Sequence, residues 1–136
     1  MKKIIYLIMI LVLSIVIAGS VYAQVPVGVI HASYNNSDFE KKFVNNIVEV
    51  IEERENLEYL EKHNDEQLLL IINTFGSEDV ILYDVTYIYS LKDSVISYFI
   101  SKYTGTDNPK TIEKTPEKII SDLEMNFYGW LNYMSD

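Results

Sequence analysis

The sequence predicts an α+β protein: a two-layer sandwich with two helices packed on one face of a four-stranded, mostly antiparallel sheet. Two amphipathic segments carry helix-start signals, one beginning at Ser37 and the other at Thr115. Four further segments have the length, branching and patterning of strands: 25–31, 67–75, 80–91 and 95–103. The element order is therefore β-α-β-β-β-α, and no internal repeat interrupts it.

The first 23 residues have the pattern of a secretory signal peptide. Lys2 and Lys3 precede an unbroken apolar run over 4–17, and small residues follow up to Ala23. This run is shorter than the roughly 20 residues that a spanning helix needs. We expect cleavage near Ala23, which leaves 24–136 as a single exported domain, periplasmic or secreted, of a bacterial cell. If the peptide were retained, it would anchor the domain to the membrane.

The first strand and the first helix are marked by local signals. Val25–His31 is β-branched and carries its proline near the start, where a strand tolerates it. Ser37 and Glu40 have the spacing of a capping box. An apolar stripe at helical spacing follows: Phe39, Phe43, Ile47 and Ile51. The segment 57–60 is expected to be a short extension packing on the core, and 63–65 a turn.

Three consecutive strands follow. The segment 68–72 is apolar at both its odd and its even positions, which is typical of a central strand covered on both sides. In 80–91 the odd positions, all of them aromatic or branched, are expected to face the core. A loop of two or four residues at 91–94 then places Ile96, Tyr98 and Ile100 on that same face.

The chain is expected to end in a polar loop and a helix. Residues 104–114 are predicted to be the loop, with Thr115 as the N-cap and Pro116 at the first helical position. The apolar stripe of this helix is Ile119, Ile120, Leu123, Phe127, Trp130, Leu131 and Met134.

Two helices can cover only one side of such a sheet, so the opposite face is predicted to be open. Ile88 and Phe99 become direct cross-strand neighbours on it in one allowed register. Asp84 interrupts an apolar strand, and Ser101 or Lys102 is available to pair with it. The candidate binding residues are Asp84, Thr86, Ile88, Ser97, Phe99 and Ser101. The face is either an ordinary solvated surface or the docking site of a partner.

Composition excludes several classes of function. The absence of cysteine rules out thiolate nucleophiles and Cys-ligated metals, and two histidines make a His-rich metal site improbable. The net charge of −9, which becomes −11 without Lys2 and Lys3, argues against nucleic acid as a partner. The candidate oxygen ligands at Glu78 and Asp79, at Asp93, and at Asp107 and Asn108 lack the spacing of a calcium loop. We expect no metal and no cofactor.

The sequence favours a non-enzymatic interaction module of the bacterial cell envelope, which binds a protein partner or a second copy of itself through the open face. One form is an inhibitor or immunity-type protein that blocks a basic secreted enzyme. The alternative is a small periplasmic hydrolase that uses His31 with a nearby serine such as Ser33 or Ser37. The chain has no Gly-x-Ser-x-Gly motif to support that chemistry.

Overall fold

The computed structural model describes residues 24–62, 66–91 and 97–135. Its elements in chain order are β1 (Val25–Ser33), α2 (Asp38–Glu53), β2 (Leu57–Leu60), β3 (Gln67–Gly76), β4 (Ile81–Ser90), β5 (Ser97–Asp107) and α3 (Thr115–Ser135). The predicted signal peptide, the turn at 63–65 and most of the hairpin loop at 91–94 lie outside the described residues.

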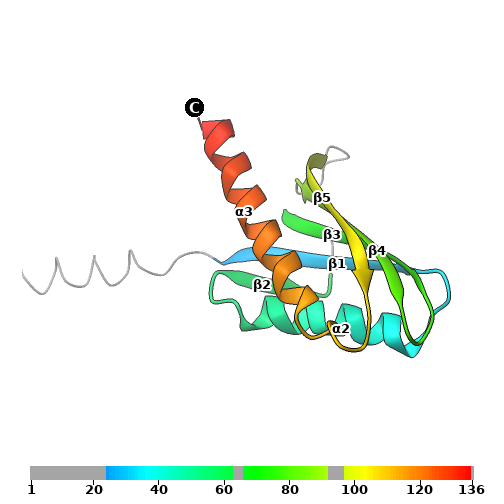
Figure 1. Cartoon of the computed structure of the whole chain (residues 1–136). Coiled ribbons are helices and arrows are strands. Elements are labelled where there is room, and N and C mark those ends of the chain that lie inside the picture. Colours follow the sequence, from blue (N-terminus) through cyan, green and yellow to red (C-terminus); the bar gives the residue numbers. More distant parts are fainter. Residues whose placement is uncertain (1–23, 63–65, 92–96, 136) are drawn as a thin grey trace, which may run out of the picture.

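The predicted α+β class is confirmed, but the sheet differs in detail from the prediction. It has five strands in the order β2-β1-β3-β4-β5 (Figure 1). The strand β1 pairs in parallel with both β2 and β3, whereas β3, β4 and β5 form an antiparallel meander. The sheet is therefore mixed rather than mostly antiparallel.

The additional strand is β2, which we expected to be only a short extension. Leu57 is buried on the helix side of the sheet, and β2 pairs with β1 from Val25↔Leu57 to Gly28↔Leu60. A four-residue segment carries too few alternations to be read as a strand from its own pattern. What makes it a strand is the free edge of β1, which supplies the backbone partners that the segment needs.

The helix α2 begins as the capping box predicts. The Ser37 side chain accepts a hydrogen bond from the Glu40 backbone, and the Glu40 side chain accepts one from the Ser37 backbone. The predicted stripe packs inward, with Phe43, Ile47 and Ile51 buried.

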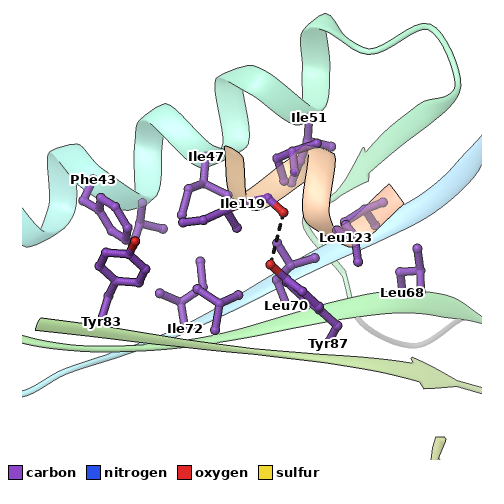
Figure 2. Packing of buried hydrophobic residues seen from close by; sticks show 14 of the residues in the cluster. Phe43, Ile47, Ile51, Leu68, Leu70, Ile72, Tyr83, Tyr87, Ile119 and Leu123 are labelled. Carbon is purple, nitrogen blue, oxygen red and sulfur yellow. Dashed lines mark hydrogen bonds between the residues drawn. The ribbon is translucent and has the colours of Figure 1, made fainter. Parts of the chain in front are cut away.

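The core lies between the helices and one face of the sheet (Figure 2). Leu70 and Ile72 of β3 face α2 there, next to the buried odd residues of β4. The Tyr87 hydroxyl donates to the Ile119 carbonyl of α3 at 3.1 Å, so the one polar group of this large side chain is satisfied. Burial raises the pKa of Tyr87 well above its usual range.

The last turns of α3 do not pack as predicted. Ile119, Ile120, Leu123 and Phe127 are buried, but Leu131 and Met134 are exposed. At 21 residues the helix is about 30 Å long, and its C-terminal end projects past the sheet (Figure 1). The apolar stripe therefore continues beyond the surface that could cover it.

The strand β5 contains an irregularity that reverses its alternation. Tyr87 pairs with Ser101 and Ile88 pairs with Phe99, so Ile100 is an extra residue on β5. Ile100 packs against the core. On the C-terminal side of this bulge, each β5 side chain lies on the opposite face from the one that simple alternation predicts. The strand is also longer than predicted, since it continues to Asp107 through part of the predicted loop.

Candidate functional site: the open face of the sheet

The candidate site is the sheet face opposite the two helices, which we call the open face. Along β4 every helix-side residue from Ile81 to Tyr87 is buried, whereas the residues between them are half-buried or exposed. Figure 2 shows the helices and the buried side chains on one side of the strands. On the other side the exposure varies along β3: Leu69 is buried, whereas Asn73 and Phe75 are exposed.

One apolar row crosses the whole open face, and we call it the Phe99 band. The strand pairings align its members Leu60, Gly28, Leu69, Ile88 and Phe99. Phe99 is 63% exposed and lies directly opposite Ile88, which is half-buried. An aromatic side chain that is exposed beside other apolar groups is typical of a contact surface.

A polar cluster, the polar centre, lies next to this band. The Lys102 ammonium forms an ion pair with Asp84 Oδ2. Asp84 Oδ1 has only long contacts, 3.5 Å to the Asn73 amide and 3.5 Å to the Thr86 hydroxyl. Thr104 completes the cluster, since it pairs with Asp84 across the strands. The pairing of Asp84 with Lys102 is one of the two that we expected.

A second apolar group lies at the far end of the face. Phe75 pairs with Leu82, and both are about half exposed. The Tyr34 ring lies against Phe75, with ring centroids 5.0 Å apart. Together with the polar centre these side chains border a hollow of about 470 Å³, which we call the Phe75 hollow.

The structure places five of the six predicted binding residues on the open face: Asp84, Thr86, Ile88, Ser97 and Phe99. The sixth placement is wrong. Ser101 pairs with Tyr87 and lies on the helix side, because the extra residue Ile100 shifts the alternation. For the same reason Lys102, which pairs with Thr86, lies on the open face.

Sequence reasoning missed the residues around the Phe75 hollow. Asn73 and Phe75 belong to a strand that is apolar on both faces over most of its length, so neither stood out. Tyr34 directly follows β1, which is two residues longer than predicted. The alternation of side chains along β3 could have revealed them, since Asn73 and Phe75 lie two and four residues after Ile71 and therefore on the same open face.

His31 lies on the helix side, in a polar cluster that joins β1, β3 and α2. Its Nε2 is 2.8 Å from the Thr74 hydroxyl. The Ser33 hydroxyl instead donates to Glu40 at 2.8 Å and accepts from the Asn36 backbone. Glu40 is fully buried. Histidine and serine are thus engaged with different partners, and the geometry shows no serine activated by His31.

The pKa values in this cluster are set by burial and hydrogen bonds. Desolvation would raise the pKa of Glu40, but hydrogen bonds from the Ser37 backbone, Ser33 and Thr74 outweigh it and lower this pKa overall. Burial lowers the pKa of His31, and the nearby Glu40 opposes this only in part. The folded protein therefore holds His31 neutral and Glu40 ionised near neutral pH.

These shifts predict a pH-dependent stability. The unfolded chain binds protons more readily than the folded one at both positions, so the free energy of unfolding should fall as the pH falls. The His31 contribution is lost below its ordinary pKa of 6.5, and the Glu40 contribution below 4.5. We expect urea midpoints to decrease from pH 7.5 to pH 5.5, and this decrease should shrink in His31→Gln. An unchanged decrease in the variant would contradict the assignment.

Neither a metal site nor a spanning helix is found in the part of the chain that the structure describes. No group of three or more potential ligands among His, Cys, Asp and Glu occurs there. None of the described helices has the length and hydropathy to cross a membrane.

Comparison with known proteins finds similarity among solved structures alone. No protein-family model and no curated protein sequence matches the chain. Among solved structures, the chain is similar to the hypothetical protein CT253 from Chlamydia trachomatis, with a TM-score of 0.44 and 7% identity, over 61% of this chain and 70% of that one. A likeness this remote indicates nothing about function.

Proposed function

We propose that the protein is an exported, non-enzymatic interaction module of the bacterial cell envelope that binds a basic protein partner through the Phe99 band. The observation that carries the proposal is the exposure of Phe99 beside Ile88 on the sheet face opposite the two helices. Aromatic residues that become buried on binding are frequent hot spots of protein interfaces.

The arrangement of apolar and polar groups supports a protein as the ligand. The Phe99 band is an apolar strip that is accessible at Phe99 and half-buried at Ile88 and Leu60, whereas Gly28 and Leu69 are buried. The polar centre beside it offers an ion pair and hydroxyl groups. Protein interfaces combine an apolar core with a polar rim in this way. The ion pair is partly exposed, so rearranging it on binding would cost little.

Charge complementarity supports a basic partner. The residues 24–136 carry a formal charge of −11, and Glu58 of β2 is an exposed charge beside the apolar strip. Glu78 and Asp79, in the turn that joins β3 to β4, are also exposed. Such carboxylates speed the encounter with a basic surface and oppose the approach of a second acidic copy. An inhibitor of a basic secreted enzyme and an assembly adaptor are two forms of this function.

The proposal is tested by capturing the partner with the tagged protein and two matched variants. Phe99→Glu places a charge in the Phe99 band, whereas Met125→Glu changes a residue of similar exposure, 68%, on α3. We expect the wild type and Met125→Glu to capture the same basic protein, and Phe99→Glu to bind it at least about thirtyfold more weakly, the effect of losing one hot spot of about 2 kcal/mol.

Two controls make the result decisive. Circular dichroism should show that all variants are folded, and His31→Ala should capture the partner like the wild type because His31 lies on the helix side. Equal capture by Phe99→Glu, or capture of only a second copy of the chain, would contradict the proposal. A hydrolytic activity that His31→Ala abolishes would favour the alternative enzyme.

A further inference from the structure

The Phe75 hollow is separate from the Phe99 band and has a different chemistry. Its apolar walls are Tyr34, Phe75 and Leu82. The two rings are tilted by 55° to each other, so they form a corner rather than a closed stack. Tyr34 is held there because its backbone donates to the Thr74 carbonyl at 3.0 Å and the Asn35 side chain donates to the Gly76 carbonyl.

The polar lining of the hollow includes the open-face residues Asn73, Asp84 and Thr104. Contacts of 3.5 Å are at the limit of hydrogen bonding, so Asp84 Oδ1 still offers an acceptor to a ligand. Asn73 and Thr104 are exposed and offer both donors and acceptors. The hollow therefore presents a mixture of donors and acceptors next to aromatic surface.

The charge in the hollow favours a neutral ligand. Lys102 compensates Asp84 through Oδ2, so the pair carries no net charge. This neutral pair offers neither a cation nor an anion a net opposite charge. A purely apolar side chain would cover Asn73, Asp84 and Thr104 without giving them hydrogen bonds, which costs free energy.

A second, more apolar hollow adjoins the first. The two share Phe75 and Leu82 as a common wall. The second adds an amide and a hydroxyl group, those of Asn35 and Ser77, beside Val80. Two adjoining hollows with a common apolar wall give room for a ligand of more than one ring.

We propose that these two hollows bind a neutral saccharide of at least two rings. A pyranose ring has an apolar C–H face that can pack on Phe75 and hydroxyl groups that both donate and accept, as Asn73, Asp84 and Thr104 require. This site does not depend on the proposed protein partner, since it lies at the far end of the open face from the Phe99 band.

The test is a titration of the ¹⁵N-labelled full chain with three neutral disaccharides: cellobiose, maltose and N,N′-diacetylchitobiose. At least one of them should shift the backbone amide signals of Asn73, Phe75 and Asp84 and the Asn73 side-chain amide, at millimolar concentrations. Phe75→Ala should weaken this binding about tenfold, because one aromatic contact contributes about 1 kcal/mol or slightly more. The matched variant Phe99→Ala should bind the sugar like the wild type.

The outcomes separate this inference from the proposed function. Absence of shifts with all three sugars at tens of millimolar, or unchanged binding in Phe75→Ala, would overturn the saccharide site whether or not the Phe99 band captures a protein. Shifts produced by N-acetylphenylalaninamide but by no sugar would overturn it too and indicate a peptide site. If Phe75→Ala does not fold, Asn73→Ala gives the same test, with an expected loss of severalfold from one hydrogen bond.

Discussion

Replacing Leu70 by Ala is expected to lower the free energy of unfolding by about 3 kcal/mol, within the usual range of about 2–5 kcal/mol for a buried leucine. Leu70 is fully buried on β3, in the layer that faces α2 (Figure 2). The substitution removes apolar contacts and leaves a cavity that the surrounding helices and strands can only partly fill. Urea unfolding followed by circular dichroism measures the loss.

A matched leucine on the other face of the sheet provides the control. Leu82 is 51% exposed on β4, on the open face. Leu82→Ala should lower the free energy of unfolding by less than about 1 kcal/mol, because about half of that side chain is exposed and its removal leaves no enclosed cavity. Similar losses for the two variants would mean that both faces of the sheet are covered, and the open face would not exist.

The second large effect is expected for Glu40→Ala, about 2–3 kcal/mol. The substitution removes the acceptor for the Ser37 backbone and for the Ser33 hydroxyl, and it leaves these donors in a partly buried place. A lost cap costs about 1 kcal/mol, and an unsatisfied buried donor costs about 1–3 kcal/mol. The two costs are not fully additive because they share the same carboxylate.

Glu49 on the same helix is the control for this effect. It is exposed on the solvated face of α2, so Glu49→Ala should change the free energy of unfolding by less than about 0.5 kcal/mol. The difference between the two variants should also shrink as the pH falls below 4.5, since the folded-state advantage of an ionised Glu40 is then lost. An equal effect of both substitutions would contradict the role of Glu40 as the link between β1 and α2.

Much of the fold could be predicted because its signals are local. The capping box at Ser37 defines the start of α2, and the parity of 81–89 identifies which residues of β4 are buried. These patterns depend on residues a few positions apart, which a single sequence displays directly.

The two main errors have causes that no local pattern displays. The edge strand β2 exists because the β1 edge is available to pair with 57–60, which is a long-range property. The bulge at Ile100 adds one residue to β5 and moves Ser101 to the helix side and Lys102 to the open face. Alternation in the sequence cannot show where a partner strand slips by one residue.

The part of the open face around Ile88 and Phe99 could be predicted from the sequence, whereas the Phe75 hollow could not. The pairing of Ile88 with Phe99 follows from strand parity and a short hairpin, and the structure has this pairing. The Phe75 hollow requires Tyr34, Asn73 and Thr104 from three separate strands or loops to meet, which depends on the strand order. Parallel pairing of β1 with β3 is what brings Tyr34 to Phe75.

The most direct test of the proposed function is site-specific photo-crosslinking in the cells that produce the protein. A benzoylphenylalanine replaces Phe99 in one variant and Tyr133, an exposed aromatic residue on α3, in the other. The proposal predicts that the probe at 99 forms an adduct with one basic protein, that the probe at 133 does not, and that adding Ile88→Glu abolishes the adduct. The proposal would be contradicted if only the probe at 133 formed an adduct, or if the probe at 99 crosslinked to no other protein.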